Sequence, residues 1–299
     1  AEFHVTAVIT VPSSLDDLSF EQVLEQLAAQ PADAKVIVDA RHCTFASPYG
    51  LTALLTLAQT RSERPTFLPP EDQDKVTYWA RAGFFRHAEE LYDVQGTVPR
   101  PRTTRESDVL LELTPVVKSD DVHTVVERIK DKATQILTNR LHLIPRATMG
   151  FTMALSEACQ NIVEHAGRGG WVMVQVYQYR KRLGGRLAVV IAVCDAGVGF
   201  RRSLESSPRR PLTDRWDDGF ALETAVVNGV SRYPEAGRGQ GLKGIRGYVH
   251  RWEGKLSVRS GTARIALVPP WDDDIPRRDN MPPFPGAQLQ ITIPEKSVA

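Results

Sequence analysis

Residues 151–166 (FTMALSEACQNIVEHA) constrain the fold more than any other stretch of the chain. Apolar side chains recur there at the spacing of one side of an α-helix: Phe151, Leu155, Ala158, Ile162 and Ala166. Four polar side chains recur with the same period on another side: Glu157, Asn161, Glu164 and His165. A carboxylate, an amide and an imidazole one turn apart can face a single ligand together. Taken alone, the pattern also fits an amphipathic helix with a solvated side.

Strands and helices alternate in residues 3–94. Apolar residues at every second position predict a strand over 3–11 with one buried side: Phe3, Val5, Ala7, Ile9 and Val11. The elements expected after it are a helix near 18–29, a strand at Lys35–Asp39, a helix at 50–59, a strand at 65–69 and a helix at 71–83. This β-α-β-α-β-α order is typical of an α/β layer.

The second half of the chain is richer in hairpins. A Pro-, Arg- and Thr-rich stretch at 95–108 predicts a linker. Strands are expected at 109–113, 171–179, 186–195, 255–260, 262–268 and 287–294, with a helix at 119–138 capped by Ser119 and Asp120. Antiparallel hairpins with a few helices on one side favour an α+β sandwich. Residues 269–285 form a polar insertion whose role the sequence leaves open.

The overall composition excludes several classes of protein. Lys and Arg total 37 against 36 Asp and Glu, so the net charge of +1 gives no reason to expect a nucleic-acid or membrane partner. No apolar run is long enough to span a bilayer, and the first residues lack the basic flank of a signal peptide. Three widely spaced cysteines, Cys43, Cys159 and Cys194, fit neither a disulfide framework nor a zinc site. We therefore expect a cytoplasmic protein.

Two glycine-rich stretches follow the 151–166 helix. Asp195-x-Gly197-x-Gly199 comes directly after a predicted buried strand, and Gly237-x-Gly239-x-Gly241-Leu242 precedes a predicted helix. Together with Glu157-x-x-x-Asn161-x-x-x-His165, these runs resemble, in order, the three ATP-binding boxes of the GHKL family. This family includes gyrase-type ATPases, histidine kinases and anti-sigma serine kinases. The resemblance covers residues 109–294 and implies the Bergerat ATP-binding fold, an α/β sandwich with a mixed, mostly antiparallel sheet.

The resemblance assigns a role to each motif residue. Asp195 would accept the adenine amino group, with Gly197 and Gly199 allowing close approach of the backbone. The loop with Gly237, Gly239, Gly241 and Leu242 would hold the phosphates at a helix N-terminus. Asn161 would bind Mg²⁺ beside phosphate oxygens, and Glu157 would be the general base. His165 would form a structural hydrogen bond, and residues 201–238, which include seven arginines, would form a lid.

Residues 36–55 (VIVDARHCTFASPYGLTALL) and 80–91 (ARAGFFRHAEEL) resemble STAS domains, the anti-anti-sigma fold. The resemblance covers residues 3–94. The family has a phosphorylated Asp-Ser-Ser-Gly turn, whereas this chain has Ser47-Pro48-Tyr49-Gly50, so Tyr49 stands at the family's serine. We therefore expect this domain to be a docking or regulatory arm.

Alternative interpretations of the motifs fit less well. Residues 239–244 match the G-x-G-x-x-G dinucleotide fingerprint, but no buried strand precedes them. His123 lacks the neighbours of a sensor-kinase phosphoacceptor. The two resemblances together predict an ATP- and Mg²⁺-dependent serine/threonine kinase acting on a partner protein, either a STAS antagonist or a sigma-like regulator. An ATP-gated binding switch with slow hydrolysis is the alternative, and a homodimer is left open.

Overall fold

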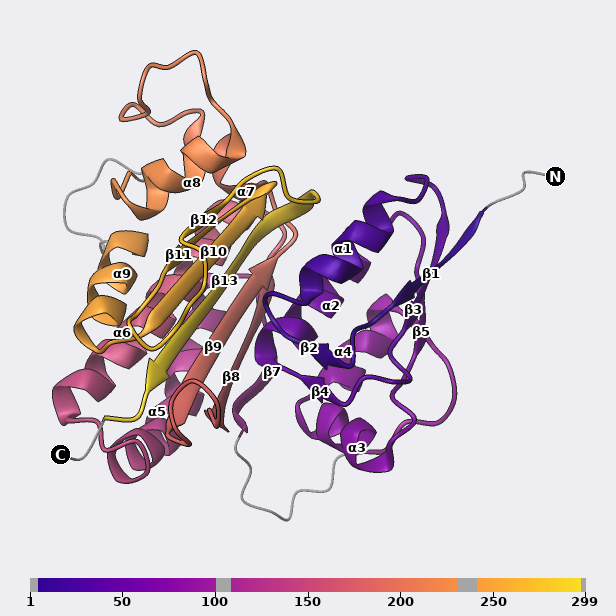
Figure 1. Ribbon diagram of the computed structural model, residues 1–299, viewed down its shortest axis with the longest axis horizontal. Coiled ribbons are helices and arrows are strands. Elements are labelled where there is room, and N and C mark those ends of the chain that lie inside the picture. The colour runs from indigo at the N-terminus through magenta and orange to yellow at the C-terminus, as the bar shows by residue number, and fades with distance from the viewer. Residues whose placement is uncertain (1–4, 101–108, 231–240, 297–299) are drawn as a thin grey trace. The chain divides into compact units, whose positions relative to one another are not determined.

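A computed structural model of the chain describes residues 5–100, 109–230 and 241–296, without the side chains of Asp131, Ala133, Thr134 and His165. The chain divides into two compact units, residues 1–107 and 108–299 (Figure 1). The division falls inside the stretch predicted to be a linker, 95–108. In the described ranges, no helix has both the length and the apolar character needed to cross a membrane.

The first unit contains a four-stranded parallel sheet with strand order β1-β3-β5-β6. Its strands are β1 (Thr6–Thr10), β3 (Lys35–Asp39), β5 (Thr66–Leu68) and β6 (Asp93–Val94). Helices α1 (Phe20–Ala28), α2 (Pro48–Gln59), α3 (Gln73–Arg81) and α4 (Phe84–Leu91) lie between the strands in sequence, and β2 (Ser14–Leu15) pairs with β4 (Phe45–Ala46). The predicted α/β order is present, with α4 and β6 as elements that the sequence had not separated.

The alternation predicted for the first strand is confirmed in part. Ala7, Ile9 and Val11 are buried as predicted, and Val8 on the other side is exposed. The prediction for Val5 is wrong: it is more than half exposed, because it lies before β1, which begins at Thr6. Phe3 lies outside the described residues. A strand with one buried side has this period of two. Phe67 on β5 packs against Trp79, Phe84 and Tyr92 with ring centroids 5.1–6.0 Å apart, so aromatic rings fill much of this core.

The turn into α2 is buried. Ser47 is 6% exposed and its hydroxyl accepts a hydrogen bond from the Gly50 N–H at 3.1 Å, which caps the helix. Tyr49 is 2% exposed and meets the Phe20 ring edge-on at a centroid distance of 6.2 Å. Both hydroxyl-bearing residues of this turn therefore belong to the folded core.

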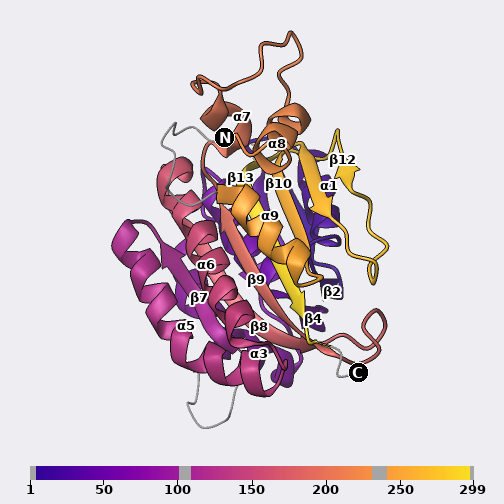
Figure 2. The ribbon, with the colours of Figure 1, turned by 90° about the vertical axis from the view of Figure 1, so that its left-hand side faces the viewer.

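The second unit contains a seven-stranded sheet with strand order β12-β11-β10-β13-β9-β8-β7. The strands are β7 (Val109–Val116), β8 (Gly170–Gln178), β9 (Leu187–Asp195), β10 (Lys255–Gly261), β11 (Ala263–Leu267), β12 (Arg277–Arg278) and β13 (Phe284–Pro294). Its helices are α5 (Ser119–Asn139), α6 (Pro145–Asn161), α7 (Gly199–Leu204), α8 (Asp218–Val226) and α9 (Gly241–Arg251). Helices α5, α6 and α9 lie over one face of the sheet (Figure 2).

The expectation of a mixed sheet in this unit is wrong. Each pairing in the described sheet is antiparallel. β9 and β10 run in the same direction, but β13 returns from the far edge and lies between them, antiparallel to both. Without β13 between them, β9 and β10 would be parallel neighbours, joined in sequence through α7, α8 and α9. Because β13 separates them, the described sheet has no parallel pair.

Two predicted helix details are also corrected. Ser119 and Asp120 do not cap α5; the Asp121 carboxylate does so by accepting hydrogen bonds from the N–H groups of Val117 at 2.9 Å and Lys118 at 3.0 Å.

The central helix begins at Pro145, and its α-helical part ends at Asn161. A π-helical turn, η1 (Ile162–Ala166), follows it. The wider π turn breaks the i, i+7 and i+8 alignment expected for Glu164 and His165.

The polar insertion at 269–285 is tied to the sheet by buried charges. Lys255 on β10 lies 3.1 Å from Asp272 and 2.9 Å from Asp274, and Arg264 on β11 lies 2.6 Å from Asp274. Lys255 and Arg264 are 7% and 2% exposed. Breaking one partner of such a network leaves a buried charge uncompensated, so the insertion is held firmly against this end of the sheet.

Candidate functional site

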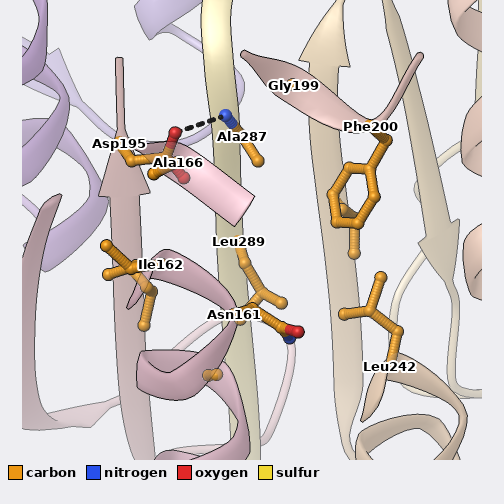
Figure 3. Close-up of a pocket in the computed structure, with 12 residues that line it drawn as sticks. Asn161, Ile162, Ala166, Asp195, Gly199, Phe200, Leu242, Ala287 and Leu289 are labelled. Atoms are coloured by element: carbon orange, nitrogen blue, oxygen red, sulfur yellow. Dashed lines mark hydrogen bonds between the residues drawn. The ribbon is translucent and has the colours of Figure 1, made fainter. Parts of the chain in front are cut away.

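A pocket opens between the central helix and the sheet of the second unit. Its wall of helical residues comprises Ala158, Asn161, Ile162 and Ala166, and α9 adds Leu242. The sheet side comprises Val193, Asp195, Val258, Ala287 and Leu289, and the start of α7 adds Gly199 and Phe200. Figure 3 shows the polar ends of Asn161 and Asp195 among these mainly apolar side chains. Two polar groups in an apolar pocket are typical of a small-molecule site.

Asp195 ends the buried strand β9 and is itself 7% exposed. Its Oδ1 atom accepts the Gly197 N–H at 2.8 Å and the Ala287 N–H at 3.3 Å (Figure 3). Oδ2 has no hydrogen bond to any described residue. Burial raises the pKa of this carboxyl group to about 7, although the two N–H donors act in the opposite direction. One oxygen is therefore fixed by the backbone, and the other is left for a ligand.

Close backbone contacts explain the glycines around Asp195. A Cβ atom on Gly197 would lie 2.1 Å from the Ala166 carbonyl oxygen. Gly199 has φ of +73°, where other L-residues are strained. Gly286, the third residue of β13, has φ of +84°, and a Cβ there would lie 2.1 Å from the Asp195 carbonyl oxygen. Gly286 is absent from the predicted site residues; its signal was the Pro-Gly pair before the last strand.

Asn161 is the last residue of α6, and its side chain lines the pocket. Its Nδ2 atom is buried and has no hydrogen-bond partner among the described residues. A buried amide without a partner costs free energy unless a ligand or water satisfies it. The missing partner of Asn161 Nδ2 therefore favours a polar ligand beside the central helix.

Glu157 lies one turn before Asn161, half-buried, outside the pocket lining itself. Burial and the nearby Glu164 charge raise the pKa of its carboxyl group, while the Gly241 N–H donates a hydrogen bond to it and opposes that shift. This contact joins the central helix to the N-terminus of α9. Glu164 accepts a hydrogen bond from Gln160 at 3.0 Å.

The structure therefore brings Asn161, Asp195, Gly199 and Leu242 to one pocket, with Glu157 and Gly241 adjoining it. Gly197 lies in the wall of a neighbouring hollow. Gly237 and Gly239, and the last residues of the predicted lid, lie outside the described residues, as does the His165 side chain. The described part of the lid folds as α7, a connecting segment and α8, and Arg210 in that segment stacks over Trp216 at 5.0 Å.

Phe200 is a pocket residue that sequence reasoning missed. Figure 3 shows its ring pointing into the pocket, toward Leu242. The free space left inside is about 30 Å³, enough for one or two water molecules. The pocket must therefore widen before a planar base can enter. Phe200 directly follows Gly199, the second glycine of the Asp-x-Gly-x-Gly run. This position is the one feature of the sequence that could have indicated a pocket residue.

A divalent cation would have few protein ligands here. The described residues contain no group of three or more His, Cys, Asp or Glu side chains placed to hold a metal ion. Mg²⁺ prefers six oxygen ligands and accepts water and phosphate oxygens among them. Asn161 fits such a shell only as one ligand beside a bound phosphate chain.

Comparison of the chain with protein-family models, with curated proteins and with solved structures returned no match.

Proposed function

We propose that the second unit binds ATP with Mg²⁺ in the Asp195 pocket, in the manner of the GHKL family that its three motifs resemble. The observation that carries this proposal is the geometry of Asp195. A buried carboxylate stands at the end of a strand, with one oxygen held by two backbone N–H groups and the other without a described partner. A fixed acceptor at the bottom of an apolar pocket is complementary to a planar base with an amino group.

Asn161 and α9 support the placement of the phosphate chain. The unpartnered Nδ2 atom of Asn161, a hydrogen-bond donor suited to a phosphate oxygen, lies on the helical side of the pocket, and α9 begins at Gly241 close to Glu157. Backbone N–H groups at a helix N-terminus favour phosphate oxygens. When bound, Mg²⁺ neutralises phosphate charge, and Asn161 is the residue of this chain that would contact it.

Glu157 is proposed to act as the general base. A carboxylate with a raised pKa accepts a proton more readily than an ordinary one near neutral pH. The acceptor hydroxyl would belong to a partner protein, a STAS antagonist or a sigma-like regulator, consistent with the STAS-like first unit. The alternative is an ATP-gated binding switch in which water replaces that hydroxyl. Phosphate on the partner supports a kinase, whereas free phosphate without a labelled partner supports the switch.

The base preference of the pocket tests nucleotide binding directly. ATP is expected to bind at least about 10-fold more tightly than inosine triphosphate, since the latter presents a carbonyl oxygen where ATP presents an amino group. Calorimetry with both nucleotides at pH 8 and equal Mg²⁺ measures the difference. Equal affinities would show that Asp195 does not contact the base, and absence of binding by either nucleotide would contradict the proposal itself.

The first unit is expected to take up no phosphate from the second. Ser47 is buried and its hydroxyl caps α2, and Tyr49 is buried against Phe20, so neither hydroxyl reaches an active site without local unfolding. Mass spectrometry after incubation of the purified chain with Mg-ATP measures this. Stoichiometric phosphate on Ser47 or Tyr49 that disappears in Glu157→Gln would show instead that the chain phosphorylates itself.

A further inference from the structure

A second, larger hollow lies beside the turn at residues 196–199. Its volume is about 480 Å³, and it shares only Ala166 and Gly199 with the lining of the Asp195 pocket. Much of its wall is glycine backbone, from Gly167, Gly197, Gly261 and Gly286. The hollow is large enough for a small organic molecule.

Three arginines, Arg168, Arg201 and Arg202, line this hollow. None of their guanidinium groups forms an ion pair or hydrogen bond with another described residue. The one acidic side chain in the lining is Asp218, whose Oδ2 accepts the N–H and hydroxyl of Thr262 at 2.9 Å and 3.0 Å. Three positive charges against one negative charge leave two positive charges uncompensated around the hollow.

The backbone that carries these arginines is anchored. The Phe200 N–H donates to the Ser260 hydroxyl at 3.0 Å, which in turn donates to the Gly286 carbonyl oxygen at 2.9 Å. The Trp216 indole N–H donates to the Arg201 carbonyl oxygen at 3.3 Å. These contacts hold α7 against β10 and β13, and they therefore fix the backbone positions of Arg201 and Arg202.

Arg168 comes from a different element and is fixed in another way. It stands between Gly167 and Gly169, both with φ of +73°. A Cβ atom on Gly169 would lie 2.9 Å from the Val116 carbonyl oxygen, so the chain passes close to β7 there. The tight turn after η1 therefore fixes the backbone position of Arg168 at the hollow, and this does not depend on α7.

We propose that this hollow is a binding site for a small dianion, such as a phosphate monoester or a dicarboxylate. The guanidinium group is planar and pairs with carboxylate or phosphate oxygens through two parallel hydrogen bonds. Two uncompensated positive charges match two negative charges on one ligand. This site lies beyond the proposed nucleotide pocket, and its existence does not depend on ATP binding.

Nuclear magnetic resonance titration of the full chain tests the proposal. Inorganic phosphate and malonate are the two probes, each added at constant ionic strength against sodium chloride. Backbone amide signals of Gly197, Gly261 and Gly286 are expected to shift and saturate with at least one probe. A response to phosphate alone assigns the site to phosphate esters, and a response to malonate alone assigns it to dicarboxylates.

Matched charge variants separate a site from general charge attraction. The double variant Arg201→Gln and Arg202→Gln is expected to weaken binding about 10-fold or more. Arg168→Gln, on another element, should weaken it as well. The control is Arg209→Gln with Arg215→Gln, which removes the same charge from the neighbouring segment outside the lining, and its affinity should match that of the parent chain.

Three results would overturn the proposal. The first is a linear response without saturation, and the second is equal weakening in the Arg209 and Arg215 control. The third is a set of shifts confined to Gly244 and Gly247 of α9, which would place the probe on the phosphate side of the nucleotide pocket instead. Failure of ATP to bind leaves all three readouts unaffected, because neither probe contains a base.

Discussion

Glu157→Gln is expected to bind ATP as tightly as the parent chain and to lose about 10²–10⁴-fold in phosphoryl transfer. The amide keeps the size of the side chain and an oxygen that can accept the Gly241 N–H bond, so the junction between α6 and α9 is retained. It has no basic carboxylate and cannot take the proton of an attacking hydroxyl. Calorimetry measures the affinity, and a single-turnover assay with the partner protein measures the transfer.

The pH dependence of transfer identifies which carboxylate acts. A general base works in its ionised form, so the rate should rise as the pH passes upward through the pKa of Glu157, which burial and Glu164 raise. The control variant Glu164→Gln removes the neighbouring charge and should move the rise to lower pH without abolishing transfer. Undiminished turnover in Glu157→Gln would assign the base to another group.

Much of the fold follows from periodicity in the sequence. The strand Lys35–Asp39 has the predicted bounds, and every apolar residue of the predicted stripe on the central helix is buried. The period of the apolar residues, two residues in a strand and 3.6 in a helix, indicates which face of the element packs against the core. They carry no information on which strands pair, so the position of β13 between β9 and β10 did not follow from the sequence.

The limits of the site prediction have a similar origin. Asp195 and Leu242 were found because each stands beside a glycine run at the end of a predicted element, and Asn161 because it lies on the polar side of the predicted helix; the structure brings all three to one pocket. Phe200 and Gly286 were missed because their roles depend on contacts between segments far apart in the chain. The π turn after Asn161 was missed because a local α-helical period gives no sign of an inserted residue.

Asp195→Ala is expected to weaken ATP binding about 10–100-fold, since it removes a buried hydrogen bond to a charged group worth about 1.5–3 kcal/mol. Asp195→Asn keeps an acceptor but adds a donor, and should weaken binding less. Asp39→Asn is the matched control, because Asp39 also ends a buried strand but belongs to the first unit. ATP binding to Asp195→Ala at the parent affinity would contradict the proposed contact with adenine.

The raised pKa of Asp195 makes this contact dependent on pH. The ionised carboxylate is the stronger acceptor, so ATP affinity should rise as the pH passes through about 7 and then level off. Asp195→Asn, measured in parallel, shows the titration of the nucleotide alone and should lack this rise.

The same shift predicts an opposite effect on stability. The folded-state pKa of about 7 exceeds the ~3.9 of an unfolded aspartate, so the contribution of this carboxyl group to stability is full below pH 4 and is lost as the pH rises through 7. Asp195→Asn is therefore expected to be more stable than the parent chain at pH 8, by about 1–3 kcal/mol, and to lose that advantage toward pH 5. Denaturant unfolding at the two pH values measures the difference. A less stable Asp195→Asn at pH 8 would show that the two backbone N–H groups outweigh the burial of the charge, and the carboxylate would then be retained for stability rather than for binding.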